Sequence, residues 1–258
     1  MSTISLLTLI LMVLMILVGG KSGFTSFLSV VFNFLILFAA VILITGGISA
    51  IGVTFFAGVC ILAITIFMGN KNETSTNTAF VATLIVMVIM LLLIVPLDYF
   101  AQIKGFSNEQ SEEIEAFNLL VGANFETILI STTVLSTLGA IAEAAVAISS
   151  GLEELSEQNP GITIAEIFKS GRTIGFQIMG MTFNTLFFGM FGGDLALFIL
   201  LYKLNVNFGY YLNSKIFVGE CMAVLYSAVA VILVIWITTY LMAVSYTHLR
   251  AHETLMNL

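Results

Sequence analysis

The run AFVATLIVMVIMLLLIVPL, Ala79–Leu97, decides the fold class. It contains no charged residue, and its length is close to the roughly 20 apolar residues that a helix needs to cross a bilayer. Strands of a membrane barrel alternate apolar and polar residues, so an unbroken apolar run predicts a helix. Comparable runs occupy Ile4–Val18, Phe24–Met68 and Cys221–Val244, the second broken by Gly46-Gly47. The chain is therefore expected to cross a membrane several times.

Composition supports an all-α, polytopic membrane protein. Of the 258 residues, 59% are hydrophobic and 9% are charged, whereas soluble domains carry about 25% charged residues. The lipid bilayer is the expected partner. The net charge of −7 argues against nucleic acid. Cys60 and Cys221 lie within apolar runs, which favours core residues over a disulfide or a metal site.

Eight apolar stretches can be placed, which predicts seven to eight transmembrane segments, because the seventh is too short to span comfortably. It is expected to pair with the sixth near 173–204, as two short helices around Gly192-Gly193 or as a re-entrant hairpin, so that Thr173 and Leu204 end on one side. The stretches are 4–18, 24–45, 47–68, 79–97, 118–142, 173–191, 193–204 and 220–243.

The distribution of basic residues predicts the orientation, because cytoplasmic loops are rich in Lys and Arg. With the N-terminus outside, only Lys104 faces outward and six basic residues face the cytoplasm. If 173–204 were a single span, Lys203 and Lys215 would move outside and the count would fall to four against three. The six are Lys21, Lys71, Lys169, Arg172, Lys203 and Lys215.

The C-terminal string VSYTHLRAHET, Val244–Thr254, resembles the translated end of a transposon adaptor used in sequencing libraries. We therefore expect a single integral membrane domain over 1–243 and a non-native tail over 244–258. A metal pair formed by His248 and His252 at helical spacing is the disfavoured alternative. Without these two, the chain has no histidine, so we expect neither an enzyme nor a resident cofactor.

Polar residues inside the apolar segments are the candidates for a transport site. A carboxylate at the bilayer centre costs about 2.5–3.5 kcal/mol on insertion scales. Glu126 is placed two turns inside the fifth segment and Glu143 at its inner end. Asn184 is placed near the midplane of the sixth segment, and Asp194 follows the Gly192-Gly193 break, where transporters often build sites.

The fifth segment has two adjoining polar faces at about 100° per residue. One carries Glu126, Thr133 and Thr137 with small residues. Glu143 lies a quarter-turn away, with Thr132, Ser136, Gly139 and Ser150. Half of this helix is therefore unsuited to lipid and is expected to face other helices or water. Small pairs such as Gly171 and Gly175 favour close helix packing.

Asp98–Glu115 forms an acidic outer loop in this scheme. A solvated helix is favoured there over a cation-attracting vestibule.

Two stretches carry a family resemblance: LGAIAEAAVAISSGLEELSEQNP, 138–160, and IFKSGRTIGFQIMGMTFNTLFFGMFGG, 167–193. They resemble the central signature of the YibE/F-like family of bacterial polytopic membrane proteins, over 118 to about 204. Members often have aspartate where this chain has Glu143. The resemblance implies a multi-pass protein of the bacterial cytoplasmic membrane, and it supplies no substrate.

These observations favour a permease-like transporter of a small solute or ion, in which the fifth and sixth segments line the path. The candidate polar site comprises Glu126, Glu143, Asn184 and Asp194. The alternative is a non-transporting scaffold or subunit that binds a co-transcribed membrane protein or forms a homo-oligomer. An intramembrane enzyme is the least favoured class, since only carboxylates and serines are available to it.

Overall fold

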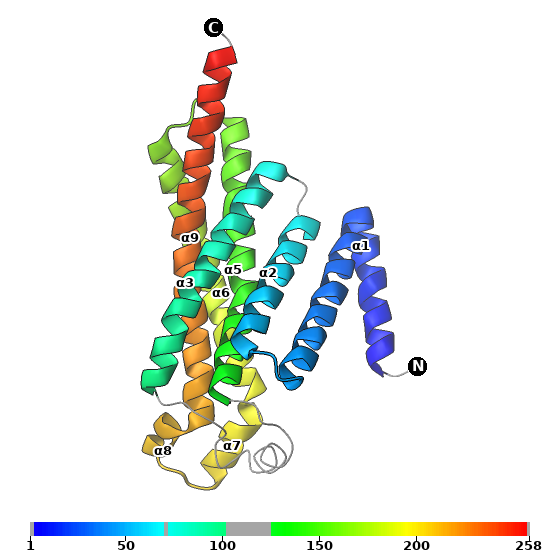
Figure 1. Cartoon of the computed structure of the whole chain (residues 1–258), viewed down its shortest axis with the longest axis vertical. Helices are drawn as coiled ribbons and strands as arrows, with labels where there is room; N and C mark the ends of the chain where they lie inside the picture. The colour runs from blue at the N-terminus through cyan, green and yellow to red at the C-terminus, as the bar shows by residue number, and fades with distance from the viewer. Residues whose placement is uncertain (1–2, 70–71, 102–124, 257–258) are drawn as a thin grey trace.

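The computed structural model describes residues 3–69, 72–101 and 125–256, and every regular element in them is a helix (Figure 1). Six of these helices are long and apolar enough to cross a membrane: α1, α2, α3, α5, α6 and α9. The all-helical prediction is confirmed. The elements are α1 Thr3–Thr45, α2 Ala50–Gly69, α3 Glu73–Ala101, α5 Phe125–Gln158, α6 Ile164–Gly193, α7 Leu195–Lys203, α8 Phe208–Asn213 and α9 Lys215–Met256.

Helix α1 consists of two helical arms that meet at Gly20. The backbone there has φ 56° and ψ −129°, a conformation that a residue with a Cβ rarely adopts. The arms run side by side in opposite directions (Figure 1). They correspond to the separately predicted stretches 4–18 and 24–45.

Helix α5 lies at the centre of the main bundle, in contact with α2, α3, α6 and α9. Its Val134, Ile141 and Ile148 are fully buried, as are Met90 of α3 and Val231 of α9. The first predicted polar face of α5 turns into this core, because Thr133, Thr137, Ala140 and Ala144 are all buried. The expectation that this face packs against other helices is confirmed.

Helices α6 and α9 approach closely at two glycines. A Cβ built on Gly171 would lie 2.5 Å from the Thr239 side chain, and one on Gly175 would clash with Ile235. The two glycines are four residues apart and face α9 together. This confirms the predicted use of small residues for close packing.

The predicted pairing of 193–204 with 173–191 is wrong. Helix α6 is continuous through Gly192-Gly193, and the Asp194 N–H still donates to Met190 O at 3.0 Å. At 1.5 Å per residue, the 30-residue helix is about 45 Å long and needs no second segment to cross a bilayer core of about 30 Å. Helix α7, with 9 residues, extends from its far end (Figure 1).

Because 193–204 does not fold back along 173–191, the number of basic residues on each side of the membrane changes. Gly171 packs against Thr239, which is 24 residues, about 36 Å, from Lys215 at the start of α9. Lys203 and Lys215 therefore lie at the opposite end of the bundle from Lys169 and Arg172 (Figure 1). The basic count falls to the weaker four against three, and the orientation stays a prediction.

Helix α9 continues past the predicted domain boundary at Ala243. The Tyr246 hydroxyl donates to Pro160 O at 2.8 Å. The helix does not distinguish 1–243 from 244–258, so this division stays a prediction.

Candidate functional site

Glu143 lies near the middle level of the bundle. A Cβ on Gly58, near the middle of α2, would lie 2.8 Å from Met87 Sδ of α3 and 3.5 Å from Leu138 Cδ1 of α5. Leu138 is therefore level with the middles of two other apolar helices. Glu143 is five residues further, about 7.5 Å along the axis. Helix α5 continues to Gln158, so the fifth segment does not end near Ala142 as predicted, and the depth of Glu143 in a membrane stays a prediction.

The second polar face of α5 points out of the chain. Its residues follow at steps of four, three, four and four, and all are exposed, whereas Ala142 and Ala144 beside Glu143 are buried. Thr132, Ser136, Gly139 and Glu143 share one face, as predicted, and Ala147, which was predicted on the first face, is exposed beside them, whereas Ser150 is half-buried. No helix of the described chain covers the five exposed residues. We call this set the α5 outer stripe: Thr132, Ser136, Gly139, Glu143 and Ala147.

Asp194 lines a cavity of about 400 Å³ between α5, α6 and α9. The junction of α6 and α7 positions it, and Glu220 from the second turn of α9 lines the same cavity. Asp194 Oδ2 is buried and has no hydrogen-bond partner within the described residues. The hydroxyl-bearing residues of the wall are Ser136, Thr185 and Ser227.

This acidic cavity can solvate a small cation or a proton. Carboxylate and hydroxyl oxygens are the ligands that hard cations prefer, and a buried carboxylate oxygen without a partner is costly. No group of three or more His, Cys, Asp or Glu ligands occurs in the described part of the chain.

Asn184 and Glu126 are not placed in this cavity. Asn184 is exposed on α6, and its Nδ2 donates to Gly180 O at 3.0 Å. Its neighbour Thr185 lines the cavity instead. Glu126 belongs to the first turn of α5, and its side chain lies outside the described residues.

Of the three predicted residues whose side chains are described, only Asp194 lines the cavity. Glu143 is linked to it indirectly, through Ser136, which belongs to both the cavity wall and the α5 outer stripe. Seven residues separate the two on one helix face, a rise of about 10 Å. Glu220, which was not among the four predicted residues, completes the acidic pair.

The sequence analysis did not predict one buried polar pair, formed by Asp98 and Tyr226. Asp98, placed in the outer loop from sequence, lies in the last turn of α3 and is 5% exposed. The Tyr226 hydroxyl of α9, on a residue 4% exposed, donates to Asp98 Oδ1 at 2.8 Å. The sequence did contain a signal for this pair, because Asp98 directly follows the apolar run that ends at Leu97. The other acids of the predicted outer loop lie outside the described residues.

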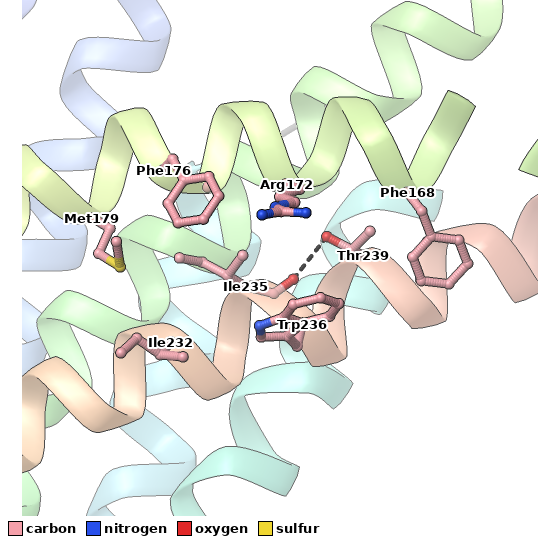
Figure 2. Close-up of a pocket in the computed structure, with 9 residues that line it drawn as sticks. Phe168, Arg172, Phe176, Met179, Ile232, Ile235, Trp236 and Thr239 are labelled. Atoms are coloured by element: carbon pink, nitrogen blue, oxygen red, sulfur yellow. Dashed lines mark hydrogen bonds between the residues drawn. The ribbon is translucent and has the colours of Figure 1, made fainter. Parts of the chain in front are cut away.

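A second, apolar groove lies between α6 and α9 at the opposite end of the bundle (Figure 2). The Arg172 guanidinium carbon is 5.2 Å from the Phe176 ring centroid, a cation–π distance. Trp236 and Ile235 form the α9 wall. An arginine at one end of an apolar groove suits the headgroup level of a membrane, so this groove is not part of the acidic site.

Comparison with known proteins now supplies the family. The family model described as YibE/F-like protein matches residues 7–248. No curated protein and no solved structure matches the chain. The match covers most of the sequence, including both stretches that carried the resemblance and every residue of the acidic cavity. The chain belongs to the YibE/F-like protein family.

Proposed function

We propose that this protein is a permease-like transporter of a small cation or of protons, and that Asp194 and Glu220 form its binding site. The observation that carries the proposal is the convergence of these two carboxylates, from the α6–α7 junction and from α9, on one cavity with three hydroxyl side chains. The single charge of a proton or alkali cation would offset the repulsion between the acids.

The position of Asp194 supports this role. Helix α6 ends at Gly193 and α7 begins at Leu195, so Asp194 lies at the end of the long helix and lines the same cavity as Glu220 of α9. From the cavity, the α5 outer stripe continues from Ser136 along the outer surface of α5 to Glu143, which offers a polar path along this helix.

The topology belongs to the same proposal. The two arms of α1 together with α2, α3, α5, α6 and α9 would make seven crossings, with the N-terminus outside a bacterial cytoplasmic membrane. The acidic cavity would then lie in the outer half. A reporter fused after Gly69 should be cytoplasmic, and an external signal there would overturn this orientation.

Flux through purified protein tests the proposal. In proteoliposomes containing a pH-sensitive dye, the wild type should dissipate an imposed proton, Na⁺ or K⁺ gradient. Asp194→Asn and Glu220→Gln should each lower this flux at least about tenfold. Glu154→Gln is the matched control, because Glu154 is exposed near the far end of α5 and accepts a local bond from Gln158. Full flux in both cavity variants would refute the assignment.

A non-transporting subunit is the second candidate, and the outward-facing polar stripe of α5 favours it, because such a face suits a partner helix. If the wild type moves none of the three ions and instead co-purifies stoichiometrically with another membrane protein, the subunit role replaces the transporter.

A further inference from the structure

The α5 outer stripe presents a carboxylate at mid-level on the outside of the bundle. Glu143 is exposed there, and it lies about 7.5 Å along the axis from Leu138, which is level with the middles of α2 and α3; a monomer in a membrane would expose it to lipid. The described cations lie toward the helix ends, at Lys21, Lys169, Arg172, Lys203 and Lys215. Within the described chain, nothing of opposite charge reaches this level.

The neighbouring flank of α6 carries amide donors at the same depth. A Cβ on Gly151 of α5 would lie 3.0 Å from Ile174 Cδ1 of α6, and Ser136 shares the cavity wall with Thr185 and Gly189. The antiparallel register therefore sets Glu143 level with about Met181. Asn184 is three residues away, about 4.5 Å along the axis.

The two flanks face the same way. On α6, Ile174 and Thr185 face α5, while Gly171 and Gly175 face α9. Viewed down the α6 axis at 100° per residue, the side that faces α5 lies between the side that faces α9 and the side that carries Gln177 and Asn184. Both of these amide side chains are exposed. The α5 outer stripe and this amide edge thus border one outward surface.

We propose that a second copy of this chain covers that surface, with a two-fold axis parallel to the bundle. Such an axis preserves depth, so the side chains of Glu143 in each copy and Asn184 in the other have to bridge an offset of about 4.5 Å along the axis, and the contact repeats reciprocally. Asn184 has two amide hydrogens and uses one on Gly180 O, so one is left for the carboxylate. Gly139 and Ala147 have little side-chain bulk and permit close approach.

The complementarity favours a second copy over a different protein. The acceptor and its donor lie on the same exposed face and about 4.5 Å apart in depth, so two identical chains satisfy each other without a foreign basic residue. This inference rests on the solvation of Glu143 and does not depend on transport.

The oligomeric state in lipid tests the proposal. Subunit counting by single-molecule photobleaching in vesicles of phosphatidylethanolamine and phosphatidylglycerol should give dimers for the wild type. Glu143→Leu and Asn184→Leu should each raise the dimer dissociation constant at least about tenfold. The double variant should add little to either, because both remove the same bond. Leu92→Ala, on the exposed side of α3, should leave the dimer unchanged.

A cross-linking measurement guards against misfolded variants. In a background with Cys60→Ser and Cys221→Ser, Ala147→Cys should give a dimer with a short bis-thiosulfonate reagent in native membranes. Leu92→Cys should not, although Leu92 is 73% exposed. Monomers in counting, unchanged dimers in both leucine variants, or linkage of Ala147→Cys to a different protein would each overturn the proposal.

Discussion

The contact between Gly171 and Thr239 gives a prediction whose magnitude follows from the structure. A Cβ at position 171 would stand 2.5 Å from both Cγ2 and Oγ1 of Thr239. The threonine cannot rotate away freely, because its hydroxyl donates to Ile235 O at 2.7 Å in a buried setting. Gly171→Ala must therefore separate α6 from α9 or break that bond, and overpacking of this kind costs about 1–3 kcal/mol.

Gly180→Ala is the matched control on the same helix. A Cβ there meets nothing within 4 Å, so the variant keeps only the gain in helix propensity, about 0.5–1 kcal/mol. That gain is common to both variants and cancels when they are compared. At about 2–4 °C per kcal/mol for a chain of this size, Gly171→Ala should melt about 2–12 °C below Gly180→Ala.

Trp236 is a convenient reporter for this measurement. It is the chain's single tryptophan, and it lines the groove between α6 and α9 beside Gly175 (Figure 2). Thermal unfolding in detergent can be followed by its fluorescence. Thr239→Ala should restore the stability of Gly171→Ala by removing both clashing atoms. Equal melting of the two alanine variants, or no rescue by Thr239→Ala, would refute the packing argument.

Four further predictions concern other parts of the molecule. Tyr226→Phe removes the hydroxyl that donates to Asp98 Oδ1 at 2.8 Å, and it should lower the free energy of unfolding by about 1–3 kcal/mol. The same melting experiment measures this against Tyr240→Phe, a change at an exposed tyrosine, and equal melting of the two variants would contradict the prediction. Gly20→Ala places a Cβ at a residue with φ 56° and should destabilise the turn between the two arms of α1 by about 1–3 kcal/mol. Gly19→Ala adds a Cβ in open space and should not destabilise it, and limited proteolysis of the turn distinguishes the two variants. Asp194→Asn and Glu220→Gln should abolish ion flux while Glu154→Gln keeps it. Glu143→Leu should dissociate the dimer in lipid without lowering the melting temperature of the monomer.

The sequence predicted which segments are helical better than where they end. Hydropathy falls after Ala142 because of Glu143, Ser149 and Ser150, so the fifth segment was predicted to stop there. In the structure Ser149 is fully buried, and its hydroxyl donates to Val146 O at 3.2 Å within the helix. A serine satisfied by its own helix costs little to bury, and a residue-by-residue hydropathy sum does not include that bond.

The acidic cavity was only half predictable for a different reason. Asp194 could be proposed from a local signal, a carboxylate after a glycine pair. Its companion Glu220 is separated from it by α7 and α8, and only the return of the chain into α9 brings the two together. For Asn184 the position along the helix was predictable, and the register with α5 agrees with it. The direction in which its side chain points was not predictable, because that depends on which side of α6 is covered by α9. Sequence periodicity gives relative angles around one helix and not the positions of its neighbours.

Ser136 connects the two proposals and allows them to be separated. It lies in the cavity wall with Asp194 and Glu220, and it also belongs to the α5 outer stripe that the second copy would cover. If the dimer seals a path along this stripe, Glu143→Leu should lower both dimer formation and ion flux, while Asp194→Asn lowers flux in an intact dimer. If each chain conducts alone, Glu143→Leu monomers should keep their flux per chain. Counting subunits and measuring flux on the same vesicles therefore decides whether the path lies within one chain or between two.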